Sequence, residues 1–499
     1  MILKPSFEDI KVILHNIGRL IIGIGILMSI PLITSILFAE WSVSLDFGIG
    51  GLLSLGLGIL LFSLFKSEKE ISWIHGLVVA SMSWIAAMFL GAIPLYLSGH
   101  FGSYLDACFD AMSGFATTGL VLIQDVNHAS NGLNMWRHFM MFLGGQGIIV
   151  VGLTFLIRGT GGAYKMYVGE AREERILPNV IQTARFIWKI SLVYLIIGTA
   201  SLAVIGLIEG MAPLRALLHG IWIFMAAFDT GGFTPQSQSI LYYHSFPFEI
   251  VTIGLMLLGT LNFGLHYALW KRDWKEPFRN IETITLFFSV MFIFTLTAIG
   301  LKQFVTYSGM AMFRKGFYQI ISGHSGTGYM TIGARQFINE WGPMAMVGAT
   351  LAMAAGGSAC STAGGIKVLR IGIFFKALFQ DVKKILSPGT ALITEKFHHL
   401  KDIVLEEKFV RSALLIILTY ILTYTLGTVV GMFYGFPLYQ AVFESVSAAA
   451  NVGLSCGITS PTMPTPLKIT YIIEMWLGRL EFMSIFALIG FIIAYFRGK

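Results

Sequence analysis

The chain has 499 residues, of which 55% are hydrophobic and only 12% are charged, and its mean hydropathy is +0.75. Soluble domains carry about 25% charged residues because water wets their whole surface, so most of this surface must face lipid or other apolar segments. The composition therefore excludes soluble enzymes and disordered scaffolds. The net charge of +7 does not indicate a nucleic-acid partner, because basic residues of membrane proteins gather in cytoplasmic loops.

Ten apolar segments are long enough to cross the membrane, since about 20 helical residues span about 30 Å of hydrocarbon. The first follows an N-terminus that contains acids and lacks a signal-peptidase pattern, so we expect it to be retained. These runs do not alternate, which favours helices over a closed β-barrel and predicts an all-α polytopic membrane protein. The predicted spans are 12–38, 46–65, 71–97, 136–157, 184–209, 248–270, 283–305, 341–375, 410–434 and 469–496.

The orientation of the spans follows from where the 34 Lys and Arg residues fall. If both termini share one side, most of these residues lie on that side, in the termini and in the loops after the second, fourth, sixth and eighth spans. Cytoplasmic loops carry the excess of basic residues in membrane proteins. Both termini are therefore predicted to be cytoplasmic.

Four of the outer connections contain an apolar stretch that is too short to span the membrane and ends in a glycine cluster. They read YLDACFDAMSGFATTGL, LRALLHGIWIFMAAFDTGGFT, MFRKGFYQIISGHSGTGYMT and PLYQAVFESVSAAANVGLS. A half-helix followed by extended backbone is tolerated at membrane depth only where it lines a water-filled path or is buried in protein. We expect four re-entrant helices at these positions.

One unit thus occurs four times: a span, a re-entrant helix, a glycine-containing string and another span. All four units run in the same direction, which predicts parallel repeats around an axis normal to the membrane, with a central pore. The predicted parts are 1–69 with two N-terminal spans, followed by one pore repeat each in 70–181, 182–280, 281–407 and 408–499. The strings assign twelve residues to the pore: Thr117, Thr118, Gly119, Thr230, Gly231, Gly232, Gly326, Thr327, Gly328, Asn451, Val452 and Gly453.

The chemistry of these strings suits a dehydrated cation. Glycine reaches positive φ without a Cβ clash, so successive carbonyl groups can turn toward the axis and replace water around an ion. Each re-entrant helix also directs the negative end of its dipole toward the membrane centre. The alternative is that the glycines are ordinary C-caps, but four equivalent glycines after four equivalent half-helices favour a selectivity filter.

The eighth predicted span contains a run of small residues that is predicted to break the helix inside the membrane. The alternative is close helix packing through small side chains. The residues assigned to this segment are Gly356, Gly357, Ser358, Cys360, Gly364 and Gly365.

Arg479 lies inside the last span, where a lone charge costs at least about 2.5 kcal/mol unless it faces water or a partner. We expect it to face the pore as part of a gate. The alternative is a structural ion pair with Glu474 or Glu481, and Glu481 could also orient a guanidinium that faces the pore.

Other chemistry is not evident in the sequence. Cys108, Cys360 and Cys456 are too few for a disulfide framework and are expected to be free thiols. The histidines and cysteines have no metal-ligand spacing, and no G-x-G-x-x-G follows a strand. We expect neither enzyme activity nor a transition metal nor an organic cofactor on this chain.

The sequence resembles the Trk/Ktr/HKT superfamily of potassium transporters over nearly its whole length, and in particular the ten-span bacterial Trk transmembrane subunit. The strings that carry the resemblance are SGFATTG, TGGFT, AGGSACSTAGGIK and LGRLE. The resemblance implies that the four glycine strings form a potassium-selective filter, and that the segment around Cys360 is an intramembrane gating loop below it. Asp229 departs from the neutral residue that many members carry before the second filter string.

The resemblance further implies a homodimer in the bacterial inner membrane and a cytoplasmic ring of separate nucleotide-binding regulatory subunits. The cytoplasmic stretch 158–189 mixes basic and acidic residues with Gly and Pro, which fits a solvated connector as well as a docking surface, and the resemblance favours docking.

Two functions remain open from the sequence. The first is potassium uptake through the filter, gated by the loop and by Arg479 under control of the regulatory subunit. The second is an ion-coupled potassium or sodium symporter that alternates access around a midplane site, which the broken eighth span also suggests. A membrane enzyme would need a nucleophile–base pair or a metal cluster at membrane depth, and the sequence contains neither.

Overall fold

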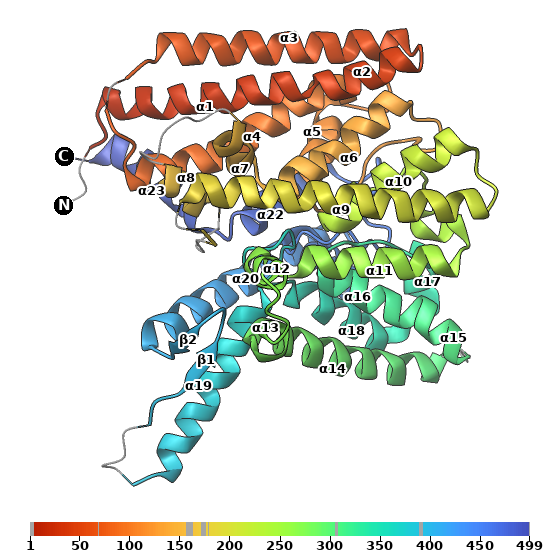
Figure 1. Ribbon diagram of the computed structural model, residues 1–499, viewed down its shortest axis with the longest axis vertical. Coiled ribbons are helices and arrows are strands. Elements are labelled where there is room, and N and C mark those ends of the chain that lie inside the picture. The colour runs from red at the N-terminus through yellow and green to blue at the C-terminus, as the bar shows by residue number, and fades with distance from the viewer. Residues whose placement is uncertain are drawn as a thin grey trace.

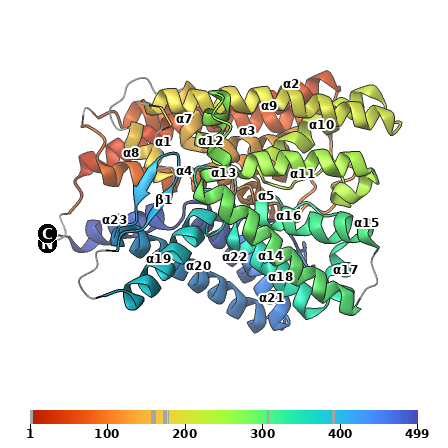
Figure 2. The same cartoon turned by 60° about the horizontal axis from the view of Figure 1, so that its bottom comes forward.

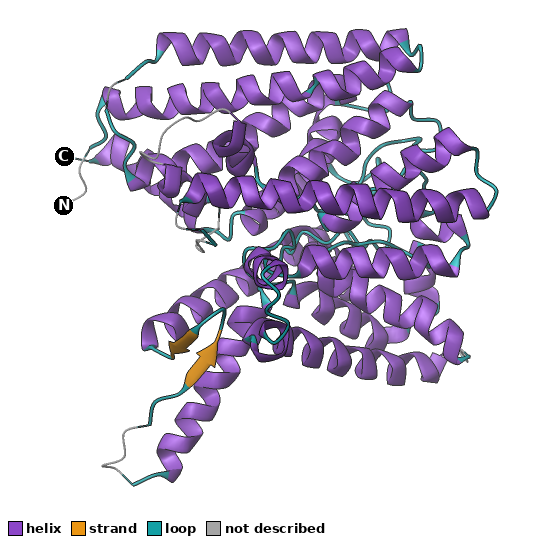
Figure 3. Ribbon diagram, viewed as in Figure 1, coloured by secondary structure: helices purple, strands orange, loops and turns teal. Residues whose placement is uncertain are grey.

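The computed structural model describes residues 4–67, 69–155, 163–170, 176, 177, 179–304, 308–388 and 393–498. Within these residues the regular structure is helical apart from one two-stranded antiparallel sheet (Figure 3). The long helices run side by side, and both termini lie at the same end of the molecule (Figure 1).

The N-terminal part is a hairpin of long helices that packs against the next long helix. Its elements are α1 (Phe7–Leu27), α2 (Ser29–Leu37) and α3 (Trp41–Leu64), followed by α4 (Trp73–Leu97). Glycines allow α1 and α3 to approach closely, since a Cβ built on Gly18 would lie 2.9 Å from the carbonyl oxygen of Gly58. Only 22% of the most apolar window of α3 is buried, so this helix presents its side chains to lipid.

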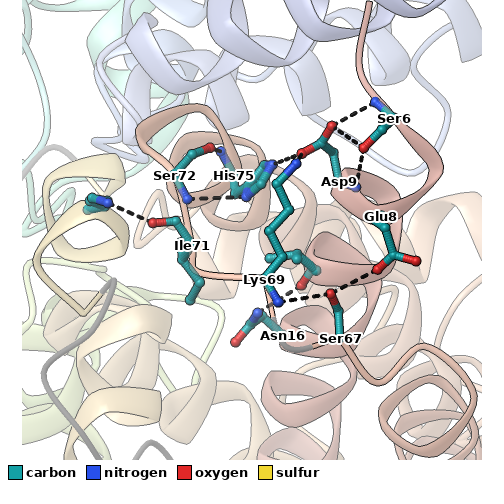
Figure 4. Close-up of polar contacts among 11 residues, drawn as sticks. Ser6, Glu8, Asp9, Asn16, Ser67, Lys69, Ile71, Ser72 and His75 are labelled. Carbon is teal, nitrogen blue, oxygen red and sulfur yellow. Dashed lines mark hydrogen bonds and ion pairs between the residues drawn. The ribbon is translucent and has the colours of Figure 1, made fainter.

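A cluster of polar contacts joins the first turns of α1 and α4 (Figure 4). Capping boxes start both helices, with Ser6 capping α1 and Ser72 capping α4. Asp9 links the two starts, because its carboxylate accepts from Ser6 Oγ at 2.7 Å, contacts His75 Nε2 at 2.8 Å and pairs with Lys69. The helices α1 and α4 are thereby fixed to each other at the end where both chain termini lie.

Four segments follow with a similar order of elements: a long helix, a short buried helix and a helix that is broken. The first comprises α4, α5 (Tyr104–Phe115), α6 (Asn131–Gln146), α7 (Ile148–Phe155) and α8 (Ala163–Gly169). The second comprises α9 (Val180–Ile208), α10 (Pro213–Phe228), η1 (Ser239–Tyr243), α11 (Phe246–Thr260), α12 (Phe263–Trp270) and α13 (Glu276–Arg279).

The third and fourth segments complete the chain. The third comprises α14 (Ile281–Phe304), α15 (Gly309–Ala311), the π-helical η2 (Met312–Phe317), α16 (Tyr318–Ser325), α17 (Ala334–Asn339), α18 (Gly342–Ala355), α19 (Val368–Leu386), β1 (Lys396–His398) and β2 (Asp402–Val404). The fourth comprises α20 (Glu407–Phe433), α21 (Leu438–Ala449), α22 (Thr465–Arg479) and α23 (Met483–Arg497).

The short helices α5, α10, α16 and α21 coincide with the four predicted re-entrant helices. Local signals start three of them: Ser103 caps α5, Pro213 opens α10, and Pro437 precedes α21. Each ends where its glycine-containing string begins. Their side chains are largely buried, so these half-helices lie inside the protein rather than in lipid.

The chain is a multi-pass membrane protein. Among the described residues, six helices are long and apolar enough to cross a membrane, or up to eight if two bent pairs each count as one span. The six are Phe7–Leu37, Trp41–Leu64, Trp73–Leu97, Val180–Ile208, Ile281–Gln303 and Glu407–Phe433, and they match the predicted spans one, two, three, five, seven and nine. The bent pairs α11–α12 and α22–α23 match predicted spans six and ten.

The remaining predicted spans, 136–157 and 341–375, are not single helices. The first divides into α6 and α7 at Gly147, which has φ +95°, and the second divides into α18 and α19 around residues 356–367. Breaks also bend α11 against α12 by 102° and α22 against α23 by 109°. Every helix that follows a glycine string is therefore interrupted, whereas the sequence predicted an interruption only in the eighth span.

The far end of α19 projects from the helical bundle, and the β1–β2 hairpin that follows lies closer to the bundle (Figure 1). The β1–β2 hairpin packs beside α13 and α19 at the end where both termini lie (Figure 2). Its register pairs Phe397 with Ile403, and Phe397 is buried in a small apolar cluster with Ile281 and Ile373. The hairpin is thus anchored to the start of α14 and to α19.

Candidate functional site

The four glycine strings share one backbone conformation. One residue shortly after each short helix, at the first or second position, has φ between +50° and +78°: Thr117, Thr230, Gly326 and Asn451. The glycine two residues later again has positive φ, from +77° to +95°: Gly119, Gly232, Gly328 and Gly453. Three of the first set are not glycines, so this left-handed turn is held by its surroundings rather than by residue preference alone.

Equivalent hydrogen bonds hold the four turns. The N–H groups of Thr118, Gly231, Thr327 and Val452 each donate back into the last turn of the preceding short helix, at 2.8 to 3.0 Å. In two strings a serine hydroxyl extends this cap, because Ser113 Oγ accepts from the N–H of Gly119 and Ser447 Oγ accepts from the N–H of Gly453, both at 3.0 Å. These bonds use backbone N–H groups of the strings as donors, and the carbonyl groups of the strings take no part in them.

The four strings close into a ring. A Cβ built on Gly119 would lie 2.5 Å from the carbonyl oxygen of Gly231 in the second string. Cβ atoms built on the other three ring glycines would collide in the same way: that of Gly232 with the carbonyl oxygen of Thr327, that of Gly328 with the carbonyl oxygen of Val452, and that of Gly453 with the carbonyl oxygen of Thr118. At each of these four glycines, a carbonyl group of the next string leaves no room for a side chain. The fourth string meets the first in the same way, which closes the ring. A side chain at any of the four positions would displace its neighbour.

Acidic side chains behind the ring hold the chain that leaves two of the strings. Asp110 of α5 accepts from the N–H of Leu122 at 2.5 Å. At the same position of α21, Glu444 accepts from the N–H groups of Cys456 at 2.9 Å and Ile458 at 3.2 Å. Both carboxyl groups are fully buried. They fix the extended backbone after the glycine and therefore support the ring from the side away from its centre.

A cavity of about 150 Å³ opens on one side of the ring. The four ring glycines line its floor, and Arg137, Phe233 and Ser455 are among its walls. The Arg137 guanidinium stacks on the Phe233 ring at 4.5 Å and donates to the carbonyl oxygen of Thr234 at 3.3 Å. The cavity lies on the side from which the extended strands leave, so it forms a vestibule above the ring.

Residues 356–367 lie on the opposite side of the ring, against the ends of the short helices. The hydroxyl group of Thr362 donates to the carbonyl oxygen of Phe228 at 3.0 Å and lies 3.2 Å from the hydroxyl group of Thr230. Gly364 packs against the carbonyl of Ala450, where a Cβ would collide. This segment has no helical structure, so the predicted break in the eighth span is confirmed and the segment forms a loop beneath the ring.

The loop is braced at its base. The N–H of Val368 donates to the carbonyl of Gly357 at 2.9 Å, and the N–H groups of Ile366 and Lys367 donate to Ala354 and Ala355 at 3.1 Å. The loop also bonds to the break between α11 and α12, since Ser358 N–H donates to the carbonyl of Thr260 at 3.0 Å. The backbone of the loop is therefore hydrogen-bonded to other segments although it is not helical.

Arg479 joins the loop, the ring and the break in α6–α7. Its guanidinium donates to the carbonyl of Thr362 at 2.7 Å, to Thr117 Oγ1 at 3.2 Å and to the carbonyls of Gly144 and Gly145. It also lies over the Trp84 ring at 5.5 Å. Arg479 therefore lies next to the first string and the loop.

The two acids proposed as partners of Arg479 have other contacts. Glu481 pairs with Arg370 and lies 3.9 Å from Lys367, both in the segment that leaves the loop. Glu474 accepts from the hydroxyl group of Ser445 at 2.8 Å behind α21. Carbonyl and hydroxyl oxygens thus surround Arg479, and Glu481 instead binds the start of α19.

A second cavity of about 410 Å³ lies below the loop. Ala359 and Cys360 of the loop line it, together with Lys367, Glu481 and His399. This cavity lies between the loop and the β1–β2 hairpin. The loop thus contacts the ends of the short helices through Thr362 and Gly364 and lines the cavity through Ala359 and Cys360.

All nineteen predicted site residues lie within the described part: twelve in the four strings, six in the loop beneath the ring, and Arg479 at the end of α22. The sequence did not indicate several residues that support them. Gly144, Gly259 and Gly478 pack against the last carbonyls of α5, α10 and α21, where a Cβ would collide with Phe115, Phe228 and Ala449. Their separation in sequence from the preceding ring glycine is nearly the same in these three segments. An alignment of the four segments with one another could have found this signal. Glu282 was also missed, because an acid at the start of a helix is ordinary.

Other residues that the sequence analysis considered have the following surroundings. The three cysteines are free and buried. Among the described residues, no group of three or more His, Cys, Asp or Glu side chains could hold a metal ion. The predicted docking segment 158–189 lies partly outside the residues that the structure describes.

Comparison with known proteins places the chain in a family. The TrkH family model, described as a cation transport protein, matches residues 46–494. The chain is 32% identical to an uncharacterised cation transporter of Methanocaldococcus jannaschii over 99% of this chain and 98% of that protein. It is 27% identical to the Trk system potassium uptake protein TrkG of Escherichia coli, over 96% of this chain and 98% of that protein.

The fold agrees with a solved structure. The crystal structure of the potassium transporter TrkH from Vibrio parahaemolyticus superposes with a TM-score of 0.81 at 22% identity, and the match covers 96% of this chain and 98% of that chain. The helical arrangement described above is therefore that of a TrkH-type membrane transporter. With a family model that matches most of the sequence, the chain belongs to the TrkH family of cation transport proteins.

Proposed function

We propose that the protein takes up potassium across the cell membrane through the ring of four glycine strings. The observation that carries this proposal is the closed ring itself, in which each glycine meets a carbonyl group of the next string. Backbone carbonyls at such a constriction can replace the water around a dehydrated potassium ion. Relatives in the family are named as potassium uptake proteins, which supports the choice of ion.

The helix ends contribute to the same preference. The short helices α5, α10, α16 and α21 all end at the ring, so four negative helix ends converge on it. This arrangement attracts a cation and repels an anion. Potassium is the cargo of the pathway and is held by the twelve string residues, with the carbonyl groups of Thr118, Gly231, Thr327 and Val452 at the level where the strings touch.

The loop and Arg479 form the gate in this proposal. The loop lies across the direction from the ring to the lower cavity, and its small residues can move without leaving a large side chain unpacked. Arg479 holds the loop by its bond to Thr362 and places a positive charge next to the first string. Opening then requires the loop to leave the guanidinium, or the guanidinium to turn away.

The membrane topology that fits this proposal has ten crossings in four parallel repeats and two N-terminal spans. The broken pairs α6–α7 and α18–α19 then count as two of the crossings, beside the six long helices and the two bent pairs. Both termini are cytoplasmic in this topology. Their position at the same end as the hairpin and α19, which carry several lysines, supports that orientation (Figure 1).

The protein also needs partners in this proposal. α19 exposes large apolar side chains, among them Phe379 at 62% and Ile385 at 82%, which fits a homodimer contact through this helix. A separate cytoplasmic subunit that binds nucleotides would control the gate from the end where the termini lie. Membership of the TrkH family supports such a subunit.

Flux through the purified chain tests the proposal. Proteoliposomes that contain the protein should take up rubidium or potassium in preference to sodium, and liposomes without protein should not. Equal uptake of sodium and potassium, or no uptake, would contradict potassium transport. Single-channel currents would identify a channel, whereas flux that saturates and requires the gradient of a second ion would identify the symporter that the sequence leaves open.

A further inference from the structure

The β1–β2 hairpin is bound to the start of α14 by a set of polar contacts. Glu276 of α13 accepts from the N–H of Leu400 at 3.1 Å and contacts His398 Nε2 at 2.9 Å. His399 lies 3.4 Å from Asn280 Oδ1 and 3.7 Å from Glu282 Oε2 through its Nδ1 atom. The tip of the hairpin and its first strand therefore meet two buried carboxyl groups of the neighbouring segment.

One of these carboxyl groups reaches the intramembrane loop. Glu282 Oε1 accepts from the backbone N–H of Ala359, and Glu282 Oε2 accepts from Asn262 Nδ2 at 3.1 Å, at the break between α11 and α12. Asn280 holds the backbone of Glu282 by accepting from its N–H at 3.0 Å. Glu282 is only 1% exposed. A single side chain thus contacts the hairpin on one side and the loop on the other.

The bond between Glu282 and the N–H of Ala359 is stronger than a hydrogen bond between two neutral backbone groups. A hydrogen bond to a carboxylate is roughly twice as strong as one between neutral groups, and a buried carboxylate that loses its donors carries a large desolvation cost. The loop has no helical hydrogen bonds around Ala359 to replace the contact. Glu282 is therefore one of the contacts that position the loop, beside the bonds of Ser358 and Thr362. Asn280 and His399 lie against Glu282.

We propose that Glu282 is a positioning residue that ties the intramembrane loop to the β1–β2 hairpin, so that displacement of the hairpin releases the loop from beneath the ring. This inference rests on the proposed role of the loop as the barrier of the pathway. A displacement of the hairpin, at the end of the molecule where the termini lie, would then reach the gate through contacts within this chain alone.

Cys360 is a built-in reporter of this movement. It follows Ala359, is 6% exposed, and lines the cavity between the loop and the hairpin. The other two cysteines are buried elsewhere, in α5 and after the fourth string, so Cys360→Ser measures the background labelling. The rate at which a water-soluble methanethiosulfonate labels Cys360 therefore reports how often the loop leaves its closed position.

The experiment measures Cys360 labelling and rubidium flux on the full-length protein in liposomes for Glu282→Gln, Glu282→Ala and His399→Ala. We expect Glu282→Ala to raise the labelling rate about tenfold or more and to raise the flux. Glu282→Gln should have a smaller effect, because its amide oxygen can still accept from Ala359. Glu406→Gln is the matched control, since this exposed carboxylate pairs with Lys408 and should change neither quantity.

A double variant separates the link from a local structural role. If the hairpin acts through Glu282, adding His399→Ala to Glu282→Ala should have no further effect on Cys360 labelling, whereas independent roles would add. Additive effects, or unchanged labelling in both Glu282 variants, would overturn the link. If Glu282→Ala does not fold, Glu282→Gln and His399→Ala still decide. A parent protein without flux would contradict the proposed potassium pathway, while the labelling results would still test the link.

Discussion

The Nη1 atom of Arg479 donates a hydrogen bond to the carbonyl oxygen of Thr362 over 2.7 Å, and this bond joins the end of α22 to the intramembrane loop. The same guanidinium contacts Thr117 of the first string and the end of α6. Three parts of the chain that are far apart in sequence therefore meet at one charged side chain. Any movement of the loop must break or carry along these bonds.

The first prediction is that Arg479→Ala increases potassium flux several-fold or more. A unit charge about 8 Å from the ion raises the ion's energy by about 2 kcal/mol at an effective dielectric constant of about 20, and the variant also frees the loop. Rubidium uptake into proteoliposomes measures the change. Arg479→Lys should lie nearer to the parent because the charge is kept, although an ammonium group cannot reach all four oxygens.

Thermal unfolding of the same variants separates the gate from a structural role. If Arg479 serves only to satisfy the carbonyls of Gly144, Gly145 and Thr362, the alanine variant should be destabilised and inactive, because those buried acceptors would lose their donor. A stable and faster alanine variant supports the gate. An unstable and inactive one rules it out.

The second prediction concerns a shortened loop. The N–H of Gly357 lies 3.4 Å from the carbonyl oxygen of Gly364, so the two ends of the loop already touch and residues 358–363 can be removed without separating α18 from α19. The deletion should raise flux because the barrier beneath the ring is gone. Rubidium uptake per folded protein, with folding checked by size-exclusion profile, measures it. Flux that stays at the parent level or falls would show that the loop is not the main barrier.

The third prediction is that serine at a ring glycine lowers the preference for potassium over sodium. Gly119→Ser and Gly232→Ser both place a Cβ at positive φ against a carbonyl group of the next string, which must shift. Competition between rubidium and sodium in uptake assays measures the preference. Gly254→Ser is the matched control, because a Cβ there meets nothing within 4 Å. An unchanged ratio in both ring variants would contradict the filter.

The ring could be predicted from the sequence because its signals are local. Each string follows an apolar half-helix, and the glycine that needs positive φ stands at the same place in all four copies. The breaks in the later helices could not be predicted in the same way. Apolar residues continue through Gly147, and Glu481 and Phe482 adopt positive φ although neither residue type favours it.

The contacts of the charged residues were equally hidden, because they depend on segments that are distant in sequence. Glu481 was considered for Arg479, two residues away, yet it pairs with Arg370 of α19. Glu282 looks like an ordinary acid in the first turn of a helix, and only the folded chain brings Ala359 and His399 to it. Periodicity locates helices, whereas a partner across the bundle is set by the packing of whole elements.

The fourth prediction concerns a buried ion pair that joins α22 to α5. Lys468 Nζ lies 2.5 Å from Asp106 Oδ1, and both side chains are less than 10% exposed. Asp106→Asn should destabilise the protein by about 3–5 kcal/mol, because it leaves the ammonium group buried without its counter-charge. Thermal unfolding in detergent measures the loss. Removing both charges, with Asp106→Asn and Lys468→Met together, should recover part of it.

A control distinguishes burial from charge in this prediction. Asp125→Asn removes an exposed carboxylate that pairs with His128 on the same side of the molecule, and it should leave the midpoint of unfolding nearly unchanged. Equal losses in Asp106→Asn and Asp125→Asn would contradict a specific role for the buried pair.

The last prediction is that the attachment of the β1–β2 hairpin weakens as the pH rises above neutrality. Hydrogen bonds to Asp402 at 2.7 Å and Glu276 at 2.9 Å raise the pKa of His398 above its usual value of about 6.5. Burial opposes the charge of Glu276, but bonds from His398 and Asn280 lower the pKa of its carboxyl group, and the bond from His398 lowers that of Asp402. Both carboxyl groups therefore stay ionised at neutral and higher pH.

The direction of the effect follows from linkage. Because the pKa of His398 is higher in the folded than in the unfolded chain, its charge stabilises the hairpin fully below about pH 6.5, and this contribution is lost as the pH rises through the folded-state pKa. The charged groups near this site also include Lys396 and Arg279, which act on Asp402 in the same direction as His398. Amide hydrogen exchange of residues 396–404, corrected for intrinsic rates, should therefore show less protection at about pH 9 than at about pH 6. His398→Gln should remove the pH dependence, and protection that is constant or rises with pH in the parent would contradict a charged His398 as the anchor of the hairpin.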